Sequence, residues 1–470
     1  MSGFASPLDA YASGTRETLL YLPAVLTRGL GWKGETPDYL ATVDVDPTSA
    51  TYSQVIHRLP MPVVGDELHH MGWNACSSCR GKTGARPHTY LCLSAVLSGN
   101  IYFVDVKTDP RAPAHYKTIQ GSEIAAKTGL ALPHTSHCAP DEIIVSHMGG
   151  IAEKGFLGKE NGFLSIDPQT LEITGRWDKN GSSQFGYDFW YQPRLNVMVS
   201  TEWGEPSCFA GGFNPAHVAD GKYGQNLYVW DWAKRTIVQT IDLGVGSIPL
   251  EVRFLHDPDS TEGYVGCALT SAMVRFYRKA DGVTWASEEV IKIPALDVTG
   301  WALPQMPGLI TDFVISLDDR FLYLANWLHG DIRQYDITNR SKPVLVGQVF
   351  IGGSVREGKG VTVTTPGYVQ PKALVVKGVE IQGGAQMVQL SLDGKRLYVT
   401  TSLFSVWDGQ FYPELVSKGG QLLVVDVNTE KGGLTLNENF LVDFGAEPFG
   451  PALPHEMRFP GGDCTSDIWI

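Results

Sequence analysis

The 470-residue chain is long enough to bury a sizeable core, and 43% of its residues are hydrophobic, as in an ordinary globular protein. A formal net charge of −13 and the lack of a Lys/Arg cluster argue against a nucleic-acid partner, because an acidic surface repels the phosphate backbone. The 52 glycines and 28 prolines indicate many tight turns, as all-β folds require.

The first segment, residues 1–20, is predicted to be an N-terminal extension, and residues 21–470 a single domain. The extension has no basic stretch followed by an apolar run, so we do not expect a signal peptide. With no run of about 18 apolar residues we expect no transmembrane segment, whereas peripheral membrane contact stays open. Seven cysteines without an export signal predict a reducing compartment, the cytosol or alternatively the nucleus, and no disulfide framework.

A strand pattern that mostly ends in aspartate recurs along the chain, each time preceded by two further short apolar segments. About four strands per repeat predict an all-β, seven-bladed β-propeller, with six or eight blades as alternatives. Residues 352–382 and 406–420 are predicted to be long loops. The C-terminal segment from Pro454 is expected to close the ring in a blade shared with the N-terminal segment. The repeats are Tyr39–Val45, Asn100–Val106, Gly162–Asp167, Asn226–Trp232, Met273–Lys279, Asp331–Ile337 and Gln421–Val427.

The first strand of each blade lines the central channel, and aligning the repeats on the turn after this strand brings polar residues to one height. Hydrophobic alternation does not explain them, although propeller channels are often polar without any metal. Imidazole and thioether ligands suit copper, with zinc as an alternative, and nearby carboxylates can orient imidazoles. His69, His137 and His329 are candidates to complete the cluster. The aligned residues are His70, His134, Tyr187, Glu251, Asp312, Met387 and His455.

Cys76 and Cys79 form a C-S-S-C motif a few residues after His70. A second C-x-x-C that would complete a structural zinc site is missing from the sequence. The pair is a candidate redox couple, thiol ligand or site for a soft element, and the alternative is two cysteines that are close in a loop without a function.

Long strings of the sequence resemble the animal selenium-binding protein family, including DELHHMGWNACSSC (66–79), LPHTSHC (132–138), NWLHGDIRQYDI (326–337) and FGPALPHEMRFPGGDCTSDIWI (449–470). The resemblance extends from about Tyr21 to Ile470. It implies a propeller that oxidises methanethiol with copper, consuming O2 and water and forming formaldehyde, hydrogen sulfide and hydrogen peroxide. The implied partners are therefore a small thiol and O2.

The resemblance carries metal-binding roles over to six histidines and a functional role to Cys76 and Cys79. We add the hypothesis that Glu251 or Asp312 accepts a proton from the substrate. Ser53 stands where vertebrate members have a cysteine that is associated with selenium, so selenium binding is in doubt. The six histidines are His69, His70, His134, His137, His329 and His455.

Two other functions compete with an oxidase. A non-enzymatic carrier of selenium or thiols would use Cys76 and Cys79 and would survive the loss of His134 and His455. An interaction scaffold would use an outer face of the propeller and has no need of three histidines at one height. Fold alone does not separate these alternatives.

Overall fold

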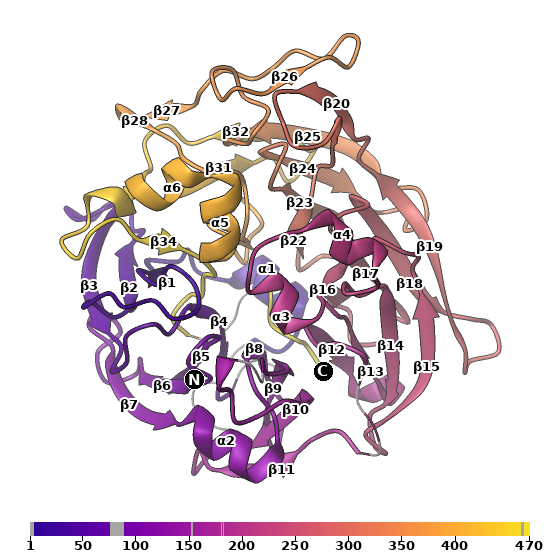
Figure 1. Ribbon diagram of the computed structural model, residues 1–470. Coiled ribbons are helices and arrows are strands. Elements are labelled where there is room, and N and C mark those ends of the chain that lie inside the picture. Colours follow the sequence, from indigo (N-terminus) through magenta and orange to yellow (C-terminus); the bar gives the residue numbers. More distant parts are fainter. Residues whose placement is uncertain (1–3, 76–88, 152–153, 180, 182, 462–464) are drawn as a thin grey trace.

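The computed structural model describes residues 4–75, 89–151, 154–179, 181, 183–461 and 465–470. Its architecture is all-β, with small antiparallel sheets arranged around a common centre, as in a β-propeller (Figure 1). None of the helices in these residues has the length and hydropathy needed to span a bilayer.

Six sheets within the described residues have four strands in sequential order or nearly so, and a seventh has four such strands and a short fifth one. Each predicted repeat forms the third strand of its sheet, as the sequence pattern indicated. The sheets are β34 (Leu453–Pro454) with β1 (Leu19–Val25), β2 (Tyr39–Asp44) and β3 (Gln54–Pro60); β4 (Leu68–Trp73), β5 (Tyr90–Ala95), β6 (Ile101–Asp105) and β7 (Ala114–Ile119); β8 (Pro133–Cys138), β9 (Ile143–Met148), β10 (Asn161–Ile166) and β11 (Ile173–Arg176); β12 (Phe189–Gln192), β13 (Val197–Ser200), β14 (Asn226–Asp231) and β15 (Thr236–Asp242); β16 (Pro249–Phe254), β17 (Glu262–Cys267), β18 (Ala272–Arg278) and β19 (Trp285–Lys292); β22 (Ile310–Ile315), β23 (Phe321–Asn326), β24 (Asp331–Asp336) and β25 (Val344–Phe350); and β29 (Val388–Leu390), β30 (Arg396–Thr400), β31 (Gln421–Val427) and β32 (Leu434–Leu436), with β33 (Val442–Asp443) also on β31.

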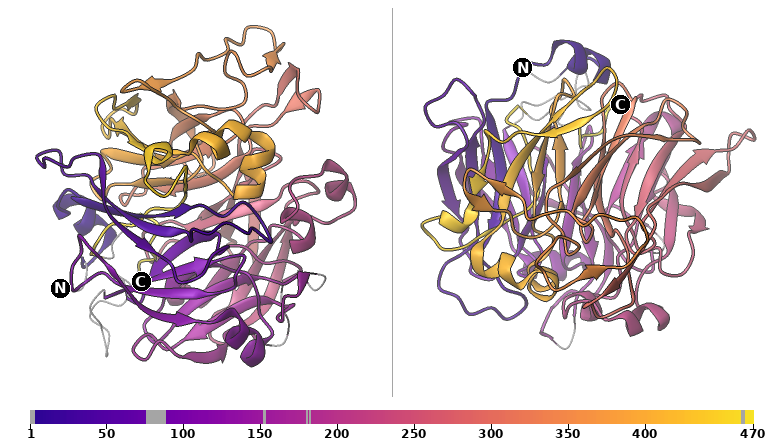
Figure 2. Two further views of the ribbon diagram at one scale, coloured as in Figure 1. Left: turned by 60° about the vertical axis from the view of Figure 1, so that its left-hand side comes forward. Right: turned by 90° about the horizontal axis from the view of Figure 1, so that it is seen from above.

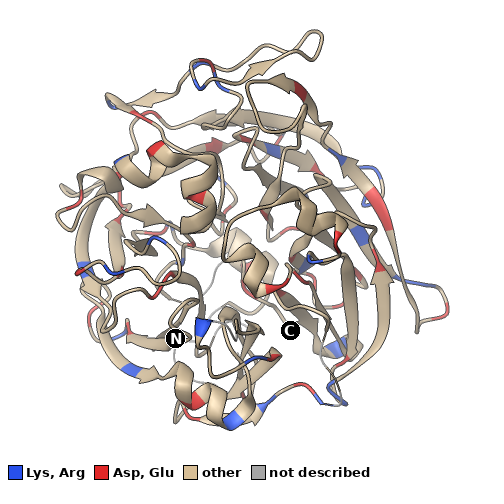
Figure 3. Ribbon diagram, viewed as in Figure 1, with Lys and Arg blue, Asp and Glu red and all other residues tan. Residues whose placement is uncertain are grey.

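Burial follows the position of a strand in its sheet. The innermost strands, such as β4, β8 and β22, are buried along their whole length because both faces are covered by neighbouring sheets. The outermost strands, such as β15 and β25, alternate between exposed and half-buried residues. The core therefore lies between the faces of adjacent sheets. Charged residues of both signs are scattered around the periphery (Figure 3).

The two predicted long loops contain short elements of structure. Residues 352–382 include β26 (Thr362–Val363), β27 (Val375–Val376) and β28 (Val379–Glu380), and β26 joins β20 (Leu296–Thr299) and β21 (Gln305–Met306). Residues 406–420 were expected to be a loop, and this was wrong, because α5 (Ser405–Phe411) and α6 (Pro413–Lys418) occupy most of them. Helices of about two turns are too short to give a clear periodicity in the sequence.

The remaining helices lie at the ends of the sheets and at their edges. The right-hand view of Figure 2 places α1 and the C-terminus at one end of the sheets, and α5 with α6 at the other. Ala10 of α1 packs against Leu317 and Trp469, so the N-terminal segment is part of the packed structure. These helices are α1 (Pro7–Ser13), α2 (Gly121–Thr128), α3 (Pro206–Phe209) and α4 (Pro215–Ala219), with short 3-10 turns at Pro193–Leu195 and Phe444–Ala446.

Candidate metal site

Irregular pairing at the start of the inner strands decides which side chains face the centre. Strand β4 slips against β5 between Leu68 and Met71, and β8 slips against β9 between Pro133 and Ser136. A bulge of this kind inserts a residue and redirects side chains. His69 and His70 are neighbours in sequence, which regular alternation would place on opposite faces, yet their ring centroids lie 4.7 Å apart.

The residue before four of the inner strands has a left-handed backbone, which is unusual for side chains other than glycine. The same conformation recurs in four different sheets. It is therefore a repeated feature of the point at which the chain enters an innermost strand. The residues are Glu67 (φ 53°), Leu132 (φ 54°), Ile248 (φ 48°) and Leu309 (φ 57°).

Four buried histidines meet at the centre. The nearest ligand nitrogens of His69, His70 and His455 all lie within 4.8 Å of one another. The rings of His69 and His455 are stacked with centroids 3.8 Å apart, and the ring of His134 lies 4.3 Å from that of His70. The structure thus brings together four of the six histidines predicted to bind metal.

Three of these imidazoles are held by one nitrogen and leave the other without a hydrogen bond. His455 Nδ1 donates to the Ser402 carbonyl at 3.0 Å, His70 Nδ1 lies 3.3 Å from Glu456 Oε1, and His134 Nδ1 is 2.9 Å from Thr135 Oγ1. Among the described residues, the Nε2 atoms of His70, His134 and His455 are buried and find no hydrogen-bond partner. Because Nδ1 of His455 must carry the proton that it donates, its Nε2 presents a lone pair.

Burial keeps His69, His134 and His455 uncharged. It lowers the pKa of His455 to about 3, and nearby His70 contributes to the shift. Burial, together with the neighbouring imidazoles, also holds the pKa values of His69 and His134 well below the ordinary histidine value. Neutral, anchored imidazoles with free lone pairs are what a borderline metal ion such as copper or zinc requires, so the residues fit a metal.

Glu456 orients the cluster and was missed by sequence reasoning. Its carboxylate accepts hydrogen bonds from the Met71 backbone N–H and pairs with Arg458 at 2.8 Å as well as with His70. Although burial opposes ionisation, Arg458 and His70 lower the pKa of Glu456 to about 2. The only signal for Glu456 in the sequence was its position next to His455. Regular alternation of side chains along a strand would have directed Glu456 away from the site.

The other two predicted ligands lie outside this cluster of rings. His137 packs edge-on against Phe189 and Trp190, with centroids 5.1 and 5.2 Å away. His329 follows β23, and its Nε2 is 3.1 Å from the Met306 carbonyl, which occupies that nitrogen. Met387, the predicted thioether at the same height, is buried in a hydrophobic cluster with Tyr398 and Met457.

The predicted carboxylates lie beside the cluster and share one arginine. Arg253 Nη2 is 3.2 Å from Asp312 Oδ1 and 3.4 Å from Glu251 Oε2. Asp312 also accepts the backbone N–H groups of Phe313 and Val388, at 2.7 and 2.8 Å, so both of its oxygens are occupied. Burial and the nearby Asp188 raise the pKa of Glu251 well above its ordinary value, and its Oε1 accepts no hydrogen bond within the described chain.

Tyr187 links the carboxylates to the imidazoles. Its ring lies 4.0 Å from that of His134, and burial with the charges of Glu251 and Asp188 raises its pKa well above the ordinary value. The phenol therefore keeps its proton at neutral pH. The predicted positions on or beside the inner strands of six sheets thus form one buried, polar assembly.

A small apolar cavity opens beside the imidazoles, and the centre of a water-sized molecule can move through about 20 Å³ of it. That is room for about one molecule of the size of water. His69 and Tyr187 form its polar side, and Trp203, Leu250 and Phe404 contribute to its apolar wall.

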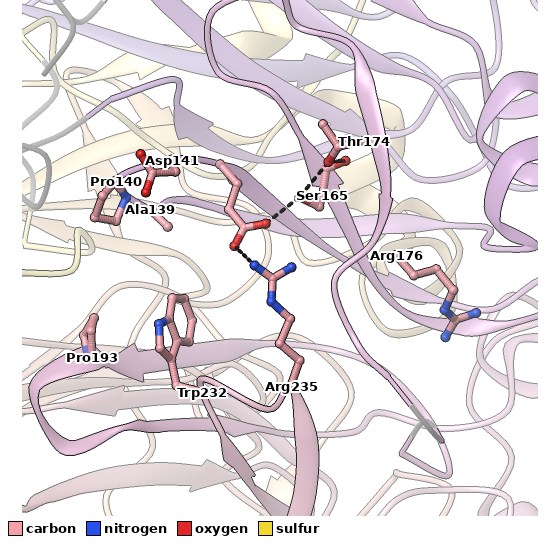
Figure 4. A pocket seen from close by; sticks show the side chains of 10 residues that line it. Ala139, Pro140, Asp141, Ser165, Thr174, Arg176, Pro193, Trp232 and Arg235 are labelled. Atoms are coloured by element: carbon pink, nitrogen blue, oxygen red, sulfur yellow. Dashed lines mark hydrogen bonds and ion pairs between the residues drawn. The ribbon is translucent and has the colours of Figure 1, made fainter. Parts of the chain in front are cut away.

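A larger pocket of about 490 Å³ lies between β8–β11 and the β12–β15 sheet (Figure 4). It contains the ion pair of Arg235 with Glu142 at 2.9 Å, and its lining includes Asp141 and Trp232 but no histidine among the described residues. The clustered imidazoles therefore lie beside the smaller cavity and not beside this larger pocket.

The cysteine predictions have mixed outcomes. Cys76 and Cys79 lie outside the described residues. Cys92, Cys208 and Cys267 are free thiols, whereas Cys138 is disulfide-bonded, a bond that the sequence did not predict. Tertiary packing explains the miss, because Cys138 contacts Ala75, which is remote in sequence. Ser53 is buried, and its hydroxyl donates to the Leu441 carbonyl at 3.1 Å.

Comparisons with known proteins identify the family of this chain. The model of the 56 kDa selenium-binding protein family matches residues 1–470. Methanethiol oxidases of Mus musculus and Homo sapiens are 57% and 56% identical, covering 100% of this chain and 98% of each relative. The crystal structure of a hypothetical selenium-binding protein from Sulfolobus tokodaii is 36% identical with a TM-score of 0.87, covering 99% of this chain and 98% of that one. The chain belongs to the 56 kDa selenium-binding protein family.

Proposed function

We propose that this chain is a methanethiol oxidase that uses copper. The observation that carries the proposal is the set of buried imidazoles whose Nε2 atoms have no hydrogen-bond partner among the described residues, while Nδ1 is held in place. Methanethiol oxidase is the name of relatives 56–58% identical to this chain over its full length.

The proposed reaction converts methanethiol, O2 and water into formaldehyde, hydrogen sulfide and hydrogen peroxide. The carbon loses two electrons, its bond to sulfur breaks and a C=O bond forms, while O2 gains the two electrons. Copper, when bound, would hold the thiolate and pass its electrons to O2. His69, His70 and His455 would hold the metal, with His134 beside them.

The protein's own residues would bind and orient the thiol and move protons. The methyl group would lie in the apolar cavity against Leu250 and Phe404, with sulfur toward His69. Burial raises the pKa values of both carboxyl groups, but Glu251 suits proton exchange better than Asp312, because one of its oxygens is free among the described groups whereas both oxygens of Asp312 accept backbone N–H groups. Asp312, with Arg253 and two backbone N–H groups, would hold the channel wall in position.

We also propose the number of blades and the way in which the ring of blades closes. The seven four-stranded sheets would be seven blades, and the C-terminal strand β34 would close the ring by pairing with β1, where Ala24 lies opposite Pro454. Packing of Leu20 and Leu22 with Leu422 and Val424 joins the last complete sheet to the first and supports this closure.

The decisive test is sulfide release from methanethiol in air, comparing copper-loaded protein with protein stripped of metal. We expect release only from the copper-loaded form, with hydrogen peroxide in equal amount. Folded, copper-containing protein that releases no sulfide would overturn the proposal. The non-enzymatic thiol or selenium carrier, which needs Cys76 and Cys79 rather than the imidazoles, would then be the better explanation.

A further inference from the structure

Two insertions from different sheets build part of the wall of the small cavity. The connection between β13 and β14 contributes Trp203 and carries α3, and the connection between β30 and β31 contributes Phe404 and α5 with Trp407. Both insertions lie over the centre of the molecule in Figure 1. Three aromatic residues, Trp203, Phe404 and Trp407, thus line the cavity together with His69, and we call these three the ceiling of the cavity.

Hydrogen bonds tie the two insertions together. Trp407 Nε1 donates to the Phe209 carbonyl at 2.9 Å. Gln410 makes a reciprocal pair with the backbone of Phe213, accepting its N–H at 2.7 Å and donating to its carbonyl at 2.8 Å. Trp203 and Phe209 are stacked with centroids 4.1 Å apart. A ceiling held at several points resists the displacement that a larger ligand would require.

The second insertion is also fastened to the strand that carries two of the histidines. The Ser405 N–H donates to Glu67 Oε1 at 2.8 Å, and Glu67 directly precedes β4. Because Glu67 is close to His69 in sequence, this hydrogen bond fixes the distance between the ceiling and His69.

Of the aromatic residues in this ceiling, Phe404 makes the ring contact with a histidine of the cluster. Its centroid lies 6.2 Å from that of His69, in an edge-to-face arrangement, and 5.9 Å from that of Trp203. The side chain is only 2% exposed. With about 20 Å³ for a water-sized centre, the space between Phe404 and the imidazoles has little room beyond a methyl group.

We propose that Phe404 sets the upper size limit of the thiol substrate, admitting methanethiol and excluding thiols with longer alkyl chains. This inference rests on the proposed oxidase function, because it names the residue that selects among substrates of the same site. A pocket of fixed shape excludes added methylene groups sterically. One methylene group changes kcat/KM by about 10- to 200-fold.

The test compares Phe404→Leu with Phe411→Leu. Phe404 is the N-cap residue of α5, whereas Phe411 is the last residue of this helix and lines a separate pocket with Trp301 and Arg356, so it controls for loosening of α5. We expect Phe404→Leu to lower the ratio of kcat/KM for methanethiol over 1-propanethiol by about 10-fold or more, and Phe411→Leu to leave it unchanged.

A second measurement does not depend on activity. Crystals of the metal-free proteins under xenon pressure should give a stronger xenon peak beside residue 404 in Phe404→Leu than in the unsubstituted protein or Phe411→Leu, because xenon occupies apolar cavities. An unchanged peak, or an unchanged selectivity ratio in a folded variant that oxidises methanethiol, would overturn the size limit. Failure of unsubstituted, copper-loaded protein to oxidise methanethiol would overturn the proposed function instead, while an added xenon peak would still locate the ceiling at Phe404.

Discussion

At the scale of single residues, the histidine cluster depends on what occupies each Nδ1. The Ser402 carbonyl and the Glu456 carboxylate bind the Nδ1 atoms of His455 and His70, and this leaves Nε2 directed to the centre. The partners are a backbone group and a carboxylate, both of which fix the tautomer. Imidazoles held in this way would bind a metal without first having to be reoriented.

Copper binding should stabilise the folded protein, since a ligand that binds only the native state raises the free energy of unfolding. We expect addition of copper to raise Tm and a chelator to reverse the rise. His455→Ala should lose this copper-dependent rise, whereas His57→Ala, at a half-buried histidine on β3, should keep it. A full rise in folded His455→Ala, measured by calorimetry, would exclude His455 as a ligand.

Two carboxylates near the cluster should have separable roles. Glu456→Gln removes the charged partner of His70 and should weaken copper binding by about 10- to 100-fold. Glu251→Gln should leave copper affinity unchanged but lower kcat by about 100-fold or more, because it removes a proton-exchanging group. Copper titration and sulfide release measure the two effects. The same loss of affinity in both variants would contradict the division of roles.

At the scale of elements, α5 depends on a buried carboxyl group. Asp408 Oδ1 accepts the Leu403 N–H at 3.0 Å, and Oδ2 accepts the Ser402 hydroxyl at 2.6 Å. Burial raises the pKa of Asp408 from 3.8 to about 7. The element that carries the cavity ceiling is therefore held by a group that titrates near neutrality.

A raised pKa has a defined effect on stability. Between pH 3.8 and about 7 the folded state holds a proton on Asp408 that the unfolded state has lost, so the free energy of unfolding falls as pH rises through this window. Asp408→Asn mimics the protonated form. It should be as stable as the unsubstituted protein at pH 5 and lose less stability by pH 8, as measured by urea unfolding of the metal-free proteins. Parallel pH profiles for the two proteins would show that Asp408 does not titrate in this range.

At the scale of the whole molecule, the C-terminal segment joins the first sheet. Five large side chains from this segment are at most 4% exposed: Leu453, Met457, Phe459, Ile468 and Trp469. Burial of such side chains contributes about 1.5–3 kcal/mol each. Their sum is comparable with the whole free energy of unfolding of a typical domain, about 5–15 kcal/mol.

A chain ending at Gly450 should therefore fail to unfold cooperatively at 25 °C. Addition of a separate peptide of residues 451–470 should restore the transition, which circular dichroism of metal-free samples would follow. The same peptide with Leu453 and Met457 replaced by Ser is the control, and it should not restore folding. A truncated chain with an unchanged Tm would contradict closure through β34.

The sequence predicted much of the fold, because each repeat carries its own strand pattern and the Asp-rich turns separate the strands. The third strands and the all-β class were confirmed. Helices α5 and α6 were missed because a helix of about two turns gives almost no periodic signal, and the cavity ceiling that they form was missed with them.

The identity of the central residues was thus determined by the sequence alone, because the repeats place His70, His134 and His455 at one height in the alignment. Which of the histidines meet was decided only by the tertiary structure. Bulges in β4 and β8 turn adjacent residues to the same side, and contacts across hundreds of residues, such as Glu456 with Met71, fix their orientation. Periodicity describes regular strands, whereas this site is formed where the strands are irregular.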